Sequence, residues 1–235
     1  MNNSTVRMAR SLGAGLRALL ALTVVTGVLY PLAVTGIAQG LFPGKANGSE
    51  TEADGRVVGS SLIGQSYDLP PKNGRQTAGP DPRWFQGRPA DGLGSNSVNT
   101  RYELILSGAT NLAADSGAVR GECPVRPEDG TLCAQVLAAK AAVVKDNSVP
   151  GHTVRPADVP ADAVTSSGSG LDPAISPRYA ALQVYRVAAR NGLPVARVEK
   201  LVEDRTEGRT LGFIGEPRVN VLELNIALRE LMAKG

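Results

Sequence analysis

The longest apolar pattern of the chain lies close to its amino terminus. From Ala18 to Gly44 no residue is charged, and as a helix this stretch would rise about 40 Å, more than the roughly 30 Å of a bilayer's hydrocarbon core. A cleaved signal peptide is the alternative, but its apolar region usually covers only about 7–15 residues. The pattern therefore predicts a membrane-spanning helix over 17–41, with a kink at Pro31 rather than an end.

Charges on the two sides of this segment predict its orientation. Arg7, Arg10 and Arg17 precede it without any acidic residue, whereas Lys45 and Arg56 beyond it are diluted by acidic neighbours. By the positive-inside rule, residues 1–16 form a cytoplasmic tail and the chain crosses the cell membrane once. We expect 42–56 to be a polar linker and 57–235 to be one extracytoplasmic domain.

Two kinds of pattern share the outer part of the chain. Its first half holds short apolar runs between glycine- and proline-rich turns, among them VVGSSLIGQSY and the run Tyr102–Leu106. Helical periodicity begins at Leu132 and ends before Asn147. Ser176 as N-cap, Pro177 and Gly192 mark the next helix, and two more are expected over 195–204 and 221–233. The fold class is therefore α+β, behind a single transmembrane helix.

The helix that follows Ser176 has two faces. One arc is apolar and predicts core contacts, and a second stripe is polar and predicts a face in solvent or against a partner. The apolar arc consists of Ala180, Ala181, Val184, Val187 and Ala188, and the polar stripe of Tyr179, Gln183, Arg186 and Arg190.

Some polar and aromatic residues are expected in the core. In the last helix Val221, Leu224, Leu228, Leu231 and Met232 share a face with Asn225. A polar side chain in that position needs a partner, most often a nearby backbone group. Trp84 and Phe85 are expected to anchor the core rather than to form a ligand site.

Composition excludes several function classes. The formal net charge of +3 comes from residues 1–17, so the remaining chain is neutral and does not indicate nucleic-acid binding. With one histidine and two cysteines, the usual four-ligand zinc site cannot be assembled from Cys and His alone, and we expect no metal. In the oxidising outer compartment Cys123 and Cys133 are expected to form a disulfide, with two free thiols as the alternative.

The glycine-rich run Ser166–Asp172 is a weak catalytic signal. It lacks the lysine of a phosphate-binding loop and does not match the GxSxG nucleophile motif, so it is read as a tight turn. A hydrolase triad would need His152, which we place exposed in a loop, to reach Ser169. No spacing supports this, and no catalytic residue is assigned.

A series of motifs resembles one known family. In order along the chain they are TGVLYPL, SSLIGQSY, WFQGRP, SGATNLA, DAVTSSGSGLDPAISP, LQVYRVAARNGL and LGFIGEPRVNVLELNIAL. Together they resemble the C subunit of the Kdp potassium-transporting P-type ATPase. The resemblance implies a non-catalytic accessory subunit, assembled with a potassium-binding channel-like subunit, an ATP-hydrolysing P-type subunit and a small membrane peptide.

The resemblance also implies a role in nucleotide handling. The family is described as a catalytic chaperone that raises the ATP affinity of the pump, and a glutamine that matches Gln183 has been connected with nucleotide. Gln183 and, one turn on, Arg186 are therefore candidates for contact with ATP or with a partner subunit. Outside the cell ATP is scarce, so we expect no stably bound cofactor, although ATP could act through the complex. We therefore favour a surface that contacts a partner, with the domain docked above the outer mouth of the potassium-binding subunit.

The sequence also departs from the family. The usual SGGSNL is SGATNL here, with Ala109 in place of a glycine, and Ala174 stands where histidine is common; residues 121–133 resemble an insertion. These departures weaken a nucleotide interpretation. An alternative function is a membrane-tethered extracytoplasmic binding or sensor domain that acts without pump subunits.

Overall fold

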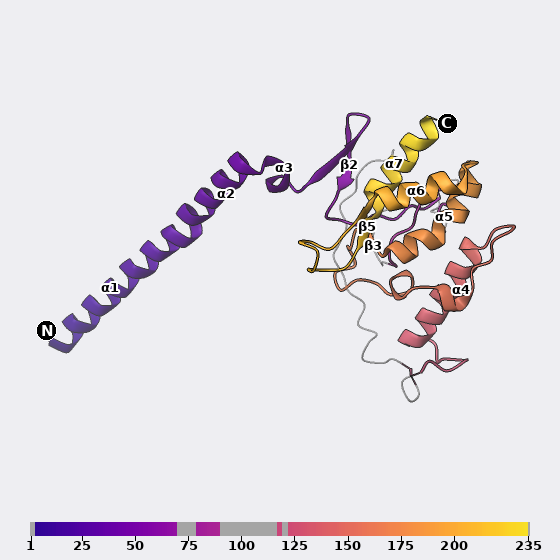
Figure 1. The fold of residues 1–235 in the computed structure, drawn as a ribbon. Helices are drawn as coiled ribbons and strands as arrows, with labels where there is room; N and C mark the ends of the chain where they lie inside the picture. Colours follow the sequence, from indigo (N-terminus) through magenta and orange to yellow (C-terminus); the bar gives the residue numbers. More distant parts are fainter. Residues whose placement is uncertain (1–2, 70–78, 90–116, 119–121, 235) are drawn as a thin grey trace, which may run out of the picture. The chain divides into compact units, whose positions relative to one another are not determined.

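A computed structural model describes residues 3–69, 79–89, 117–118 and 122–234 (Figure 1). The chain divides into two compact units, Met1–Glu50 and Thr51–Gly235. The predicted apolar run Tyr102–Leu106 and the substituted position Ala109 lie outside the described residues. The mixture of helices and small sheets confirms the α+β class.

The first unit is dominated by one apolar helical run. It comprises α1 (Asn3–Val24), a π-helical turn η1 (Val25–Leu29) and α2 (Tyr30–Leu41). Its segment Val6–Leu41 is long and apolar enough to cross a membrane, and none of its most apolar window is buried within the protein. The helix begins at Asn3, well before the predicted start at residue 17, because 3–16 contain no proline to interrupt it. The helix also continues through Pro31, which lies in the first turn of α2, directly after the π-helical turn η1. A π-helical turn is a common way for a helix to accommodate a local distortion such as that caused by proline.

The segment 42–56, expected to be a linker, holds regular structure. It contains the short helix α3 (Pro43–Ala46) and the strand β1 (Glu50–Ala53), which pairs with β2 (Arg56–Ser60). Asp54 and Gly55 both have positive φ, 51° and 71°, as the tight two-residue turn of a hairpin requires.

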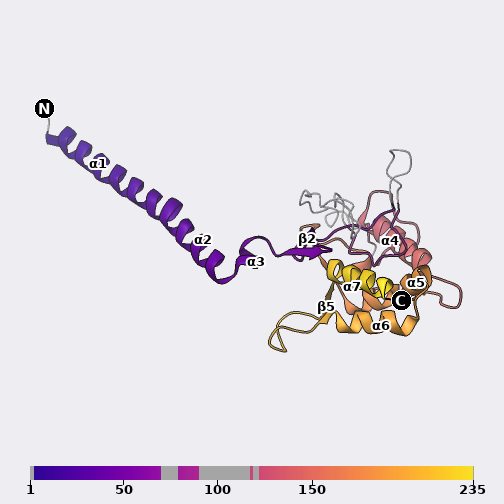
Figure 2. The ribbon, with the colours of Figure 1, turned by 90° about the horizontal axis from the view of Figure 1, so that it is seen from above.

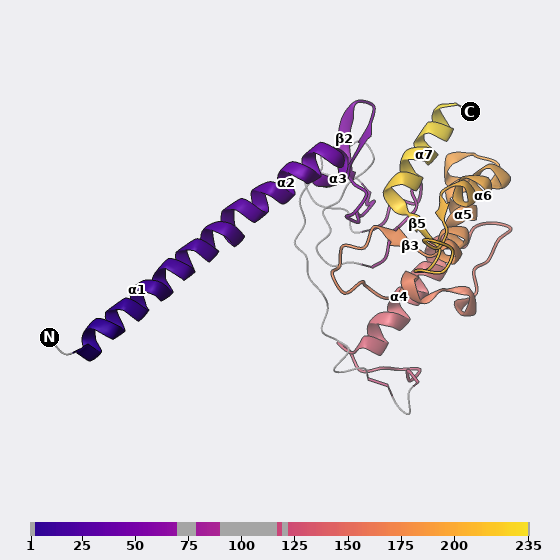
Figure 3. The ribbon, with the colours of Figure 1, turned by 60° about the vertical axis from the view of Figure 1, so that its left-hand side comes forward.

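Helices are the longest regular elements in the described part of the second unit. They are α4 (Leu132–Asn147), α5 (Pro177–Asn191), α6 (Val195–Asp204) and α7 (Val221–Ala233), with short 3-10 turns at Pro156–Asp158 and Ala161–Ala163. The four helices confirm the predicted segments. Helix α5 packs against α4 and α6, and α6 packs against α7 (Figure 1, Figure 3).

A small antiparallel sheet accompanies these helices. Its order is β3 (Ala174–Ile175), β5 (Arg218–Asn220) and β4 (Thr206–Glu207), with Val219 opposite both Ile175 and Thr206. Val219 is fully buried, so the sheet contributes its centre to the helical core. Trp84 and Phe85 are 8% and 0% exposed and belong to the same core cluster, which confirms their predicted anchoring role.

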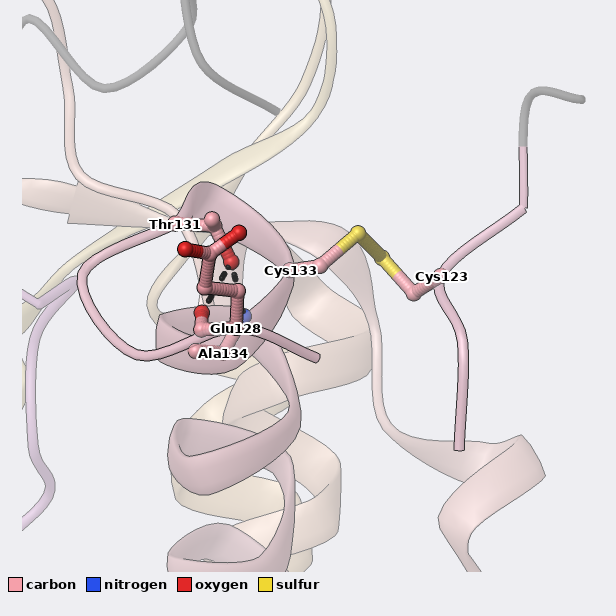
Figure 4. Close-up of a disulfide and its surroundings, with 5 residues drawn as sticks. All are labelled: Cys123, Glu128, Thr131, Cys133 and Ala134. Atoms are coloured by element: carbon pink, nitrogen blue, oxygen red, sulfur yellow. Dashed lines mark hydrogen bonds between the residues drawn. A yellow bond between two sulfur atoms is a disulfide. The ribbon is translucent and has the colours of Figure 1, made fainter. Parts of the chain in front are cut away.

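Cys123 and Cys133 are joined by a disulfide with a Cα–Cα distance of 5.3 Å. Cys133 lies in the first turn of α4, and Thr131 caps that turn by accepting a hydrogen bond from the Ala134 N–H at 3.3 Å (Figure 4). The Thr131 hydroxyl also donates to the Glu128 carbonyl at 2.7 Å. Disulfide and cap together fix the start of the helix to the segment that carries Cys123.

Candidate functional site

The candidate residues Gln183 and Arg186 lie on α5, whose ends follow the predicted signals. The Ser176 hydroxyl accepts from the Tyr179 N–H at 3.1 Å, and Gly192 closes the helix in the left-handed conformation at φ 65°. Asp162 holds the cap, since its carboxylate accepts from the backbone N–H and the hydroxyl of Ser176 at 2.7 and 3.0 Å. The helix is thus fixed at both ends.

The predicted polar stripe of α5 is wrong for three of its four members. Tyr179, Gln183 and Arg186 are 4%, 0% and 2% exposed, and only Arg190 is exposed. In the predicted apolar arc, Ala181 is exposed while the other four members are buried. Helix α5 is covered on more than its apolar side, because the segment that contains Trp84 packs across its polar residues.

Gln183 binds the backbone of Gln86. Its carbonyl oxygen accepts from the Gln86 N–H at 2.7 Å, and its amide donates to the Gln86 carbonyl at 3.0 Å. These two bonds imitate one rung of a β-ladder, with a side-chain amide in place of a strand. The extended segment around Gln86 therefore obtains from a helix the partners that it would otherwise find in a sheet.

Asn225 of α7 binds the backbone of Phe85, the residue before Gln86, in the same way. The Phe85 N–H donates to its carbonyl oxygen at 2.9 Å, and its amide donates to the Phe85 carbonyl at 3.0 Å. The expectation that Asn225 finds a backbone partner is confirmed. Two amides from two helices thus hold successive residues of the Trp84–Gly87 segment.

Arg186, one turn further along α5, completes this network. Its guanidinium donates to the carbonyls of Pro82 and Trp84 at 2.5 and 2.9 Å, and to Asn147 Oδ1 at 2.8 Å. It also donates to Gln183 Oε1 at 2.7 Å. One buried side chain therefore joins the end of α4, helix α5 and residues 82–84.

Burial governs the electrostatics of this cluster. Desolvation lowers the pKa of Arg186 to about 10, which still leaves the guanidinium charged at neutral pH. Burial also raises the pKa of the Tyr179 hydroxyl to about 12. A buried cation is costly unless its donors are satisfied, and here backbone and amide oxygens satisfy them.

Arg88 secures the end of the same segment. It donates to Asp172 Oδ2 at 3.1 Å and to the carbonyls of Thr165 and Ser166 at 3.3 and 3.2 Å. This connects WFQGRP to the glycine-rich run Ser166–Asp172. That run is a turn, as predicted, with Gly170 at φ 70°.

The remaining candidates do not come together as a catalytic group. His152 is half-buried rather than exposed, and its ring stacks on Tyr185 with 3.7 Å between centroids. The hydroxyl of Ser169 lies instead within its own turn, where it accepts from the Leu171 N–H at 3.1 Å. Within the described ranges, no three Cys, His, Asp or Glu side chains gather as metal ligands would.

A pocket of about 660 Å³ borders the network between α4, α5 and residues 86–89. Gln183, Arg186 and Arg190 contribute to its wall, together with Lys145 and Asp146. The carbonyl oxygen of Gln183 already accepts two hydrogen bonds, and its amide donates one. At most one donor of Gln183 therefore remains for anything that enters the pocket.

Sequence reasoning did not find the partners of these residues. Gln86 and Asn147 had no role in it, although Asn147 closes α4 and Gln86 follows the aromatic pair. A signal was present in the pattern: Gln183, Arg186 and Asn225 are polar residues beside apolar helix faces, where a buried partner is required.

Comparison with known proteins bears on the role of this fold. The family model described as "KdpC: K+-transporting ATPase, c chain" matches residues 12–230. A protein from Streptomyces coelicolor named "Potassium-transporting ATPase KdpC subunit" is 72% identical to this chain, over 100% of this chain and 99% of the relative. A protein of the same name from Streptomyces avermitilis is 67% identical, over 99% of both chains. One from Gemmatimonas aurantiaca is 45% identical over 91% of this chain and 89% of its own length. The chain belongs to the KdpC family of potassium-transporting ATPase subunits.

Proposed function

We propose that this chain is a non-catalytic accessory subunit of a high-affinity, ATP-driven potassium import complex. The observation that carries the proposal is the family match, which covers both the apolar helix and the outer domain. Its partners would be the potassium-binding channel-like subunit, the ATP-hydrolysing P-type subunit and the small membrane peptide. The contribution of this chain would be assembly and a higher ATP affinity of the hydrolysing subunit.

We further propose that this effect does not need a nucleotide held by Gln183 and Arg186. Both side chains are buried and bound to each other. Gln183 also binds the backbone of Gln86, and Arg186 donates to the carbonyls of Pro82 and Trp84. An ATP phosphate would need free donors, commonly backbone N–H groups of a glycine-rich loop together with a lysine. The two residues are better suited to hold the Trp84–Gly87 segment in place.

The proposed orientation places the amino terminus in the cytoplasm and the domain outside. It rests on Arg7, Arg10 and Arg17 before the apolar helix and on the mixed charges after it. A reporter enzyme that works only outside the cytoplasm, fused after Gly235, is expected to be active. Activity of a cytoplasmic reporter at the same position would reverse the orientation.

Assembly is tested by co-expression of the full chain with the other pump subunits and purification through a tag on this chain. The ATP-hydrolysing subunit is expected to elute with it, and the same pump prepared without this chain is expected to show a raised KM for ATP. A chain that migrates alone in mild detergent would contradict the proposal. An unchanged KM would contradict the chaperone role alone.

A further inference from the structure

The loop between β4 and β5 exposes three large apolar side chains within four residues. Leu211, Phe213 and Ile214 are 79%, 72% and 51% exposed. The loop extends away from α5, α6 and α7 as a narrow projection (Figure 1, Figure 2). Single exposed apolar residues are ordinary on protein surfaces, but a contiguous group is typical of an interaction site.

The backbone of this tip is fixed before any partner arrives. Thr210 and Ile214 exchange two hydrogen bonds, at 2.9 and 3.0 Å, and the Gly212 N–H donates to the Arg209 carbonyl at 3.0 Å. Leu211 has φ 55°, a conformation that costs a residue with a side chain about 1–2 kcal/mol and glycine almost nothing. The tip thus keeps a strained, exposed leucine where glycine would be easier, which indicates that its side chain serves a contact beyond the domain.

Two charged pairs lie next to the apolar tip along the hairpin. Arg209 bonds Glu216 at 2.9 Å, and Arg218 bonds Glu207 at 2.8 Å, both across the hairpin. An apolar centre within a polar rim is the usual anatomy of a protein–protein interface. A segment that lies on anionic lipid more often carries arginines and lysines without such acidic partners. The pattern therefore favours a protein surface over a bilayer.

We propose that the hairpin tip 209–216 docks into an apolar hollow on the extramembrane surface of another subunit of the potassium-transporting ATPase. Leu211 and Phe213 would fill the hollow, and the paired charges would lie at its rim. This inference rests on the proposed function, since it requires the other subunits to be present. It adds to the proposed function the identity of the segment, 209–216, that contacts another subunit.

A photo-crosslink from the tip tests the contact. Phe213→Cys is introduced in the full chain, co-expressed with the other subunits and labelled with a benzophenone maleimide, which the disulfide-bonded Cys123 and Cys133 do not take up. Irradiation is expected to join the chain to another subunit. Ala189→Cys, at an exposed position near the end of α5, is the matched control and is expected to give at least about tenfold less product.

A second variant tests the energetics. Leu211→Ser with Phe213→Ser is expected to make the chain leave the detergent-solubilised complex about tenfold faster, a change of about 1.4 kcal/mol and more than most interface residues contribute. Val125→Ser, which changes a 95% exposed valine elsewhere, is expected to leave that rate unchanged.

The outcomes distinguish a failure of the proposed docking tip from a failure of the proposed accessory function. If the wild-type chain co-purifies with the pump, but Phe213→Cys links only to lipid or to nothing and the double variant dissociates normally, the docking tip is wrong and the accessory role stands. If the wild-type chain does not co-purify at all, both are wrong.

Discussion

Replacement of Gln183 by alanine separates a structural from a ligand-binding role. The change removes three hydrogen bonds, two with the backbone of Gln86 and one from Arg186. Each buried group left without a partner costs about 1–3 kcal/mol, and entry of water from the adjoining pocket would recover part of this. We expect a loss of about 3–5 kcal/mol, a large share of the roughly 5–15 kcal/mol that stabilise a typical domain.

Trp84 provides the assay, since it is the only tryptophan and its carbonyl accepts from Arg186. Unfolding of the full chain in mild detergent, followed by its fluorescence, is expected to shift to lower temperature by about 6–20 °C for a domain of this size. Arg190→Ala, at an exposed position on the same helix, is the matched control and is expected to change stability by less than about 0.5 kcal/mol.

Gln183→Glu refines the result. Glutamate keeps the volume and the acceptors for Arg186 and the Gln86 N–H, but it loses the donor to the Gln86 carbonyl. Its destabilisation is expected to lie between that of alanine and the wild type. The reasoning is refuted if Gln183→Ala unfolds at the wild-type temperature while the KM of the assembled pump for ATP rises, because that combination describes a ligand contact and not a structural one.

Two further perturbations address the same fold. Asn225→Ala leaves the Phe85 N–H and carbonyl without partners and is expected to cost about 2–4 kcal/mol, measured by denaturant unfolding. A loss below about 1 kcal/mol would contradict the role of Asn225 in holding the Trp84–Gly87 segment. Replacement of Cys123 and Cys133 by serine is expected to cost about 2–3 kcal/mol by the loop-entropy model, without loss of pump assembly. Reductant should lower the unfolding midpoint of the wild type and leave that of the double variant unchanged.

Local patterns were sufficient for the apolar helix and for the four long helices of the outer domain, but not for the hairpin that begins within 42–56 or for the small sheet. An uncharged apolar run long enough to cross a bilayer, a serine cap followed by proline, and a glycine after the last turn are each visible within a few residues. The helices over 132–147, 177–191, 195–204 and 221–233 formed where these signals indicated. The motifs that carry the family resemblance are also local, and the family match agrees with them.

Tertiary structure alone decided which side of α5 is buried. Helical periodicity assigns polar residues to solvent, and by that rule Gln183 and Arg186 should face outward. They are buried because a segment about 100 positions earlier in the chain packs across them, and its carbonyl and N–H groups need partners. Such a pairing depends on how two distant segments meet, which no window of sequence records; the physical reason is that a buried backbone group must be satisfied by whatever lies beside it.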